Sequence, residues 1–138
     1  MVIAVPGAIE SSHPTDSLAR EVIASSIRDA ARDPGVRLTL IAGDAGVGKS
    51  HLLERIATEL EAARAWGVVA LSDVPGSSLA HLVRPTGSHA DMVVDLLANA
   101  RAWLAVDDID RCDALSQALI SRLLRERDRQ VVATVRTD

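Results

Sequence analysis

The eight residues GDAGVGKS, Gly43 to Ser50, constrain the fold of this chain more than any other stretch. They match the pattern G-x-x-x-x-G-K-[ST], in which a glycine-rich turn joins a strand to a helix. The preceding residues 36–42, VRLTLIA, are rich in β-formers, and an apolar helix face follows at Leu52, Leu53, Ile56 and Leu60. This context predicts an α/β domain with a parallel sheet and a phosphate-binding turn at the carboxyl edge of that sheet.

The turn contains the residue types that phosphate binding needs. Its three glycines permit backbone conformations and close approaches that side chains forbid, so the amides of residues 46–50 can point at phosphate oxygens. Lys49 is expected to reach the β- and γ-phosphates, and the Ser50 hydroxyl is expected to bind Mg²⁺. Asp44 lies in the variable part of the pattern and is not required. The predicted nucleotide-binding residues of this segment are Gly43, Gly46, Val47, Gly48, Lys49, Ser50 and His51.

A second motif, WLAVDDID from Trp103 to Asp110, places acidic residues at the end of an apolar strand. Ligands of parallel sheets bind at the carboxyl ends of the strands. We assign Asp107 to Mg²⁺, usually through water, and Asp108 to the general base that polarises an attacking water. The alternative is a solvated acidic turn that caps the next helix. Asp110 and Asp113 fit that alternative better, and Asp113 is the predicted N-cap.

The last motif, ATVRTD, follows the final β-prone run. Thr134 and Arg136 are expected at the same carboxyl edge as the glycine-rich turn. There Thr134 would contact the nucleotide, and Arg136, which is always charged, would read the γ-phosphate. The alternative for Arg136 is an ordinary surface residue after a strand.

The rest of the chain alternates helical and strand patterns. A first helix is predicted over residues 15–32, ended by the Asp-Pro-Gly of residues 33–35, and its apolar positions are Leu18, Val22, Ile23 and Ile27. Further helices are predicted at 88–100, where Ser88 starts a capping box, and over 115–124. After the strand at 36–42, strands are predicted at 67–72, 101–106 and 130–135, with a short helical turn at 77–83.

Composition excludes several classes of protein. The chain has 138 residues, 48% hydrophobic and 25% charged, which fits one globular domain. Its net charge of −4 and its 1% aromatic content argue against direct DNA or RNA binding. No stretch is long and apolar enough for a membrane span, and a lone Cys112 suits a reducing compartment, so we expect a cytoplasmic protein. One arginine-rich segment, interleaved with acidic residues, is interpreted as a solvated helix end: Arg122, Arg125, Arg127 and Arg129.

The order of the motifs GDAGVGKSHLL, LAVDDIDRCDALSQALI and VVATVRTD resembles the nucleotide-binding domain of STAND-class ATPases, in particular that of large LuxR-family (MalT-like) transcriptional regulators. The resemblance covers residues 37–138 and extends to the related AAA+ class. It implies a P-loop NTPase three-layer sandwich with sheet order 5-1-4-3-2, and ATP or ADP with Mg²⁺ as cofactors. Walker A then maps to residues 43–50, Walker B to Asp107 and Asp108, and sensor 1 to Thr134 and Arg136.

The chain also departs from this family. Residues 8–20 contain no recognisable GR-x-x-E box, so no adenine contacts are predicted. The segment between the second strand and Walker B is short, and the fifth strand, the helical and winged-helix subdomains and the C-terminal DNA-reading domain have no counterpart. We therefore expect a fragment or truncated product. It would consist of an N-terminal segment with the first helix, 1–35, and an ATPase core, 36–138, that contacts itself or the missing domains.

The leading functional hypothesis is an ATP-binding switch of a signal-responsive transcriptional regulator, reset by slow hydrolysis. The alternatives are an AAA+ motor or helicase-loader ATPase, because GKSHLL with DDID also occurs there, and a non-hydrolysing remnant. The implied sheet order without strand five also predicts an exposed edge on the strand before the turn, and an aggregation-prone or dimeric chain. The alternative is that MVIAV, Met1 to Val5, covers that edge.

Overall fold

The computed structural model describes residues 1–5, 14–44, 46, 48–84, 88–100, 102–126 and 128–137. Within these ranges five strands form: β1 (Val2–Ala4), β2 (Leu38–Gly43), β3 (Ala63–Trp66), β4 (Trp103–Asp107) and β5 (Gln130–Arg136). The helices of the same ranges are α1 (Pro14–Arg32), α2 (Lys49–Leu60), α3 (His89–Asn99) and α4 (Ala114–Leu123). Short 3₁₀ turns lie at Val69–Leu71, Ser77–Leu79 and Ile109–Arg111. In this part of the chain, every helix is too short or too polar to cross a membrane.

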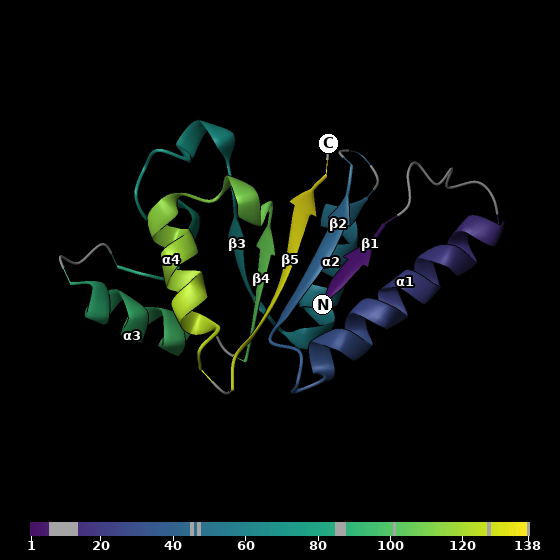
Figure 1. The fold of residues 1–138 in the computed structure, drawn as a ribbon, viewed down its shortest axis with the longest axis horizontal. Coiled ribbons are helices and arrows are strands. Elements are labelled where there is room, and N and C mark those ends of the chain that lie inside the picture. Colours follow the sequence, from purple (N-terminus) through teal and green to yellow (C-terminus); the bar gives the residue numbers. More distant parts are fainter. Residues whose placement is uncertain are drawn as a thin grey trace.

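The strands form one parallel sheet in the order β1-β2-β5-β4-β3, which Figure 1 shows from right to left. The predicted order 1-4-3-2 is confirmed: β2, β5 and β4 are the predicted strands one, four and three, and β3 occupies the place predicted for strand two. One core cluster joins α1 and α2 to one face of the sheet, and a second joins α3 and α4 to the other. The fold is thus the three-layer α/β sandwich with a parallel sheet expected of a P-loop NTPase.

The edge of the sheet beside β2 is covered by β1. The Leu40 amide donates to the Met1 carbonyl at 2.8 Å, and the Val5 amide donates to the Ala42 carbonyl at 2.7 Å. Val5 is buried in the core on the α1 side, and Ile3 packs against the same cluster. The expectation of an exposed edge on the strand before the turn is therefore wrong, and the alternative, in which Met1 to Val5 covers it, is confirmed.

The second predicted strand is also displaced from its predicted position. Glu61 has a left-handed backbone, with φ of 53°, which ends α2, and β3 follows at once and pairs with β4. Residues 67–72, predicted to be this strand, instead leave the sheet and contain the 3₁₀ turn Val69–Leu71. A Cβ on Gly67 would lie 2.1 Å from the Asp108 carbonyl oxygen, so only glycine can occupy this position. The apolar residues of 67–72 suggest a buried strand, but Val68 and Leu71 are about half exposed, at 45% and 46%.

Helix α1 packs on the sheet through a face different from the one its large apolar residues suggest. Ala24, Ile27 and Ala31 are buried in the core, whereas Leu18 and Val22 are 68% and 66% exposed. The helix prediction is confirmed, but two of its four predicted apolar positions lie on the solvent side. Small alanines bring this helix close to the sheet, which explains why they form the contact face.

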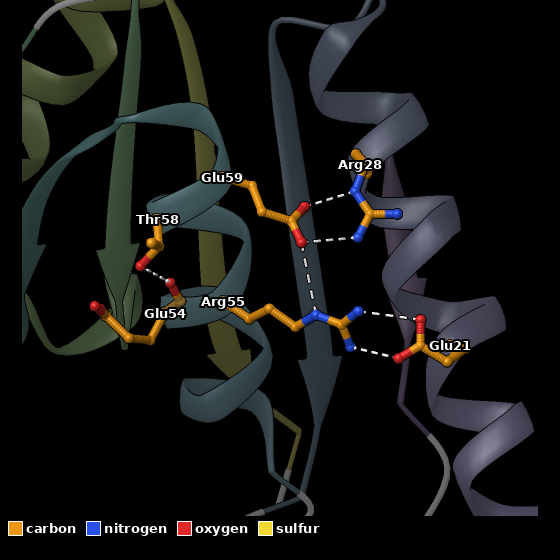
Figure 2. Close-up of polar contacts among 6 residues, drawn as sticks. All are labelled: Glu21, Arg28, Glu54, Arg55, Thr58 and Glu59. Atoms are coloured by element: carbon orange, nitrogen blue, oxygen red, sulfur yellow. Dashed lines mark hydrogen bonds and ion pairs between the residues drawn. The ribbon is translucent and has the colours of Figure 1, made fainter.

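Ion pairs fasten α1 to α2, the helix that starts at the glycine-rich turn (Figure 2). Arg55 on α2 donates to Glu21 at 2.7 Å, and Arg28 on α1 donates to Glu59 at 2.6 Å. The hydrogen bond from Arg55 lowers the pKa of Glu21, and the one from Arg28 lowers the pKa of Glu59. These pairs are solvent-exposed and fix the orientation of the two helices more than they stabilise the fold.

Candidate functional site

Two glycines of the glycine-rich turn have left-handed backbone conformations. Gly46 and Gly48 have φ of 81° and 90°, a region that favours glycine, and a Cβ on either would meet no atom within 4 Å. The reason for glycine here is therefore the backbone conformation and not a lack of space. Gly48 is the N-cap of α2, so the first free amides of that helix face the turn. Val47, predicted to bind the nucleotide, lies outside the described residues, as does Ala45.

Lys49 lies inside the turn. Its side chain is buried, and Nζ donates to the carbonyl oxygen of Asp44 at 2.7 Å. The ammonium group thus lies against the first residue after β2, and a bound phosphate oxygen would replace this carbonyl as its acceptor. Gly43, the last residue of β2, is buried and pairs in register with Arg136 of β5.

The first turn of α2 meets the end of β4 through Ser50 and Asp107. Ser50 Oγ lies 2.9 Å from Asp107 Oδ1 and 2.8 Å from Asp107 Oδ2. A hydroxyl and a carboxylate at this spacing are oxygen ligands that Mg²⁺ accepts, one directly and one through water. The structure thus brings together the two residues that the sequence assigns to the metal.

Thr134 lies beneath this pair, fully buried on β5. Its hydroxyl donates to Asp107 Oδ1 at 2.6 Å and accepts from the backbone amide of Asp108 at 2.8 Å. The side chain therefore orients both acidic residues instead of facing the surface of the site. Contact between Thr134 and a nucleotide stays a prediction, and the geometry adds a role in positioning Asp107.

Asp108 stands where the backbone is strained. Its φ and ψ are 51° and 59°, a left-handed conformation that few non-glycine residues adopt. Burial, with the negative charges of Asp107 and Asp110, raises the pKa of the Asp108 carboxyl. A strained residue with a raised pKa at the mouth of a cavity is suited to take up a proton.

These side chains surround one cavity of about 440 Å³ at the carboxyl edge of the sheet. It joins residues from the turn, from α2, from the β4 end and from the β5 end. Its lining residues are Gly46, Gly48, Lys49, Ser50, His51, Asp108 and Arg136. Arg136 is half-buried at the end of β5, and His51 is exposed on the first turn of α2. Of the predicted site residues that the structure describes, only Gly43, Asp107 and Thr134 do not line this cavity; they lie at its strand ends.

Two further residues of the site were not predicted. Thr137 Oγ1 donates to Asp44 Oδ1 at 2.9 Å, and the Thr137 amide donates to the Gly43 carbonyl at 3.2 Å. Asp44 is variable in the sequence pattern, yet here it fixes the end of β5 next to Arg136. The signal for this contact is the pairing of β2 with β5, since Gly43 opposite Arg136 places the residues that follow them side by side.

Asp113 is confirmed as the N-cap of α4, and its carboxylate does more than cap. It accepts from the Ser116 amide at 2.9 Å and also from the Gly76 and Ser78 amides, at 2.5 and 3.1 Å. Burial opposes its charge, but hydrogen bonds from Ser116, Ser78 and Gly76 outweigh burial and hold the pKa of Asp113 well below its usual range. Asp113 therefore joins the loop after β3 to the helix after the acidic pair.

No protein-family model matches this chain, and no curated protein matches it. Among solved structures, it is similar to a chain in the structure of Drosophila ORC bound to GC-rich DNA and Cdc6, with 16% sequence identity and a TM-score of 0.45. The similarity covers 94% of this chain and 54% of that chain, so the present chain spans about half the length of its structural neighbour.

Proposed function

We propose that this chain binds a nucleoside triphosphate, ATP by its family resemblance, with Mg²⁺ at the cavity above β2, β4 and β5. The observation that carries the proposal is the convergence of Ser50 on both carboxylate oxygens of Asp107, with Lys49 buried in a glycine-rich turn beside them. A surface turn has no need of a buried ammonium group. This arrangement offers amides and a cation to phosphate and oxygen ligands to a metal.

Each residue has a defined part in this proposal. The amides from Gly46 to Ser50 and the N-terminus of α2 would hold the β- and γ-phosphates. Ser50 and Asp107 would hold Mg²⁺, which neutralises charge on the phosphate oxygens when it is bound. Asp108, whose pKa is raised, would take the proton of an attacking water, and Arg136 would stabilise the γ-phosphate.

The biological role that we propose is a nucleotide-dependent switch in a signal-responsive transcriptional regulator, as the resemblance to LuxR-family domains suggests. Slow turnover with tightly retained nucleotide supports a switch, whereas continuous DNA-stimulated turnover supports a motor or loader. We further propose a cytoplasmic location, contact with a second copy or with additional domains, and no direct DNA contact by this chain.

Nucleotide binding can be tested by calorimetry with Mg²⁺-ATP and Mg²⁺-ADP. Lys49→Ala should weaken binding strongly, because it removes the charge that faces the phosphates. Arg122→Ala is the matched control, since it removes the same charge from the last turn of α4, remote from the cavity. Equal affinity of wild type, Lys49→Ala and Arg122→Ala, all folded by circular dichroism, would contradict the proposal.

Labelling gives an independent test, because Lys49 is the only lysine in the chain. An amine-reactive acetylating reagent can modify only Lys49 and the α-amino group. Mg²⁺-ATP should protect Lys49 from acetylation, as measured by mass spectrometry, and should leave the α-amino group unprotected. Equal protection of both amines, or of neither, would speak against a phosphate at the turn.

A further inference from the structure

A second cavity, of about 400 Å³, lies on the α3 and α4 side of the sheet, among residues that the nucleotide site does not use. Eleven described residues line it, from the loop after β3, from α3 and from α4. Leu79 and Leu119 form its buried floor, while Leu71 and Val74 at its mouth are 46% and 48% exposed. Met92 of α3 and Leu115 of α4 form the walls between them.

The wall of this cavity is apolar, and the polar groups described below already have hydrogen-bond partners. None of the eleven lining residues is charged. Among the lining residues, only Ser77 carries a side-chain hydroxyl. This hydroxyl donates to the Leu71 carbonyl at 2.9 Å. The amides of Gly76 and Ser78 are taken by Asp113. A charged occupant would therefore lose its hydration without gaining a hydrogen-bond or charge partner. An uncharged apolar occupant has no such cost.

The size of the cavity selects the kind of occupant. Protein interfaces use roughly 20–30 residues a side, so the hollow by itself, with eleven lining residues, is sized for a small molecule. The volume falls within the range of about 300–1,000 Å³ found for small-molecule sites. We infer that this cavity binds an uncharged, largely apolar small molecule, and that its occupancy is coupled to the acidic pair through Asp113.

The coupling follows from how the loop between β3 and α3 is anchored. At its start, the Gly67 amide donates to the Asp107 carbonyl at 2.8 Å, and the missing Gly67 side chain lets the Asp108 backbone approach. Further along, Gly76 and Ser78 are bound to the buried Asp113 carboxylate. The segment 67–78, which contains the mouth residues Leu71 and Val74, is thus held at both ends by residues 107–113. A molecule that fixes the loop acts on the position of that segment.

Binding can be tested with N-phenyl-1-naphthylamine, an uncharged probe whose fluorescence rises in apolar surroundings. We expect saturable binding of one probe per chain. Val74→Asp places a charge at the mouth and should weaken binding more than about tenfold, because the probe would bury an unpaired carboxylate. Val22→Asp, at a solvent-exposed valine of α1 that is 66% exposed against 48% for Val74, is the control and should bind like wild type.

Three results would overturn the cavity assignment. The first is fluorescence that never saturates, and the second is an equal loss of affinity in Val74→Asp and Val22→Asp. The third is a signal that rises only as light scattering reports association of chains, which would mean that a second copy forms the apolar site. Both variants change an exposed side chain, so their folding can be verified by circular dichroism before the titration.

The coupling half of the inference rests on the proposed nucleotide site and has its own test. Mg²⁺-ATP affinity is measured with and without saturating probe, and probe affinity with and without Mg²⁺-ATP. The factor by which the probe changes ATP affinity should equal the factor by which Mg²⁺-ATP changes probe affinity, and both should differ from one. Asp113→Asn should bring both factors to one. Probe binding with no effect on ATP affinity would overturn the coupling alone. A chain that binds the probe but no nucleotide would refute the proposed function and, with it, the coupling, while the cavity would stand.

Discussion

Ser50 and Asp107 lie 57 positions apart in sequence, yet the Ser50 hydroxyl is within 2.9 Å of both carboxylate oxygens of Asp107. The sheet order explains the contact. Helix α2 starts at the end of β2 and crosses over β5 to pack on β4, so its first turn stands above the β4 end. Thr134 on the intervening β5 fills the space between the two strand ends and bonds to Asp107. Packing of α2 on the sheet thus positions the two proposed metal ligands next to each other.

Asp107→Asn should remove the dependence of nucleotide affinity on Mg²⁺. An amide keeps the shape of the side chain and can still bond to Ser50, but it lacks the charge that favours a divalent cation. The measurement is ATP affinity over a Mg²⁺ titration. Asp110→Asn, in the exposed turn that follows, is the control and should keep the wild-type dependence. If both variants keep it, the metal assignment of Asp107 is wrong.

Asp108→Asn should keep nucleotide bound while lowering hydrolysis, because an amide cannot accept the proton of the attacking water. Loss of a general base typically costs about 10²- to 10⁴-fold in rate. The measurement is phosphate release under single-turnover conditions, with affinity determined separately by calorimetry. Hydrolysis at the wild-type rate would show that another group, or none, takes the proton.

Thr134→Val should weaken both the fold and the metal site. Valine fills the same volume but loses the bond to Asp107 and leaves the Asp108 amide without its partner, at a cost of about 1–3 kcal/mol. Urea denaturation measures the first effect, and the Mg²⁺ titration measures the second. Thr134→Ser keeps the hydroxyl and should restore the metal dependence. A stable Thr134→Val chain with normal Mg²⁺ dependence would exclude the positioning role.

The parts of the site that could be predicted are those that local sequence encodes. The glycines of the turn, Lys49 and the acidic pair follow from a strand, a turn and the residue types that phosphate and Mg²⁺ need. Parallel strands have their carboxyl ends at the same edge of the sheet, so Ser50 and Asp107 could both be assigned to one proposed metal site before their contact was known. Asp113 was recognisable as an N-cap because its position before an apolar helix is a local signal.

The parts that could not be predicted depend on contacts between distant segments. Gly67 ends β3 because the Asp108 backbone passes against it, and the apolar run after it gave the opposite signal. The inward direction of Thr134 depends on the register of β5 against β4. The bonds of Asp113 to Gly76 and Ser78 join residues more than thirty positions apart, which no spacing rule in one sequence can show.

Asp113→Asn should lower stability at neutral pH by about 2 kcal/mol or more, because an amide has one acceptor oxygen and cannot replace both carboxylate oxygens, which accept from the amides of Ser116, Gly76 and Ser78. The pKa of Asp113 is lowered in the folded chain, so its stabilisation is present above the usual Asp value of 3.8 and is lost as the pH falls below it. Wild type and variant should therefore differ in urea midpoint at pH 7, and the difference should narrow as the pH falls below 3.8. A constant difference across this range would show that the carboxylate charge is not the cause.

Removal of residues 1–5 should destabilise the chain and promote its association. Without β1, the backbone groups of Leu40 and Ala42 lose their partners, and an apolar strand edge is exposed to other chains. Chemical denaturation and light scattering of the shortened and full chains measure the two effects. Leu18→Ser is the control, because this residue is 68% exposed on α1, and it should behave like wild type.

Ile3→Asp tests the same strand without shortening the chain: it places a carboxylate against the core and should detach β1. A shortened chain that stays monomeric with unchanged stability would show that β1 does not support β2, and the glycine-rich turn would then be held by β5 and the two helices alone.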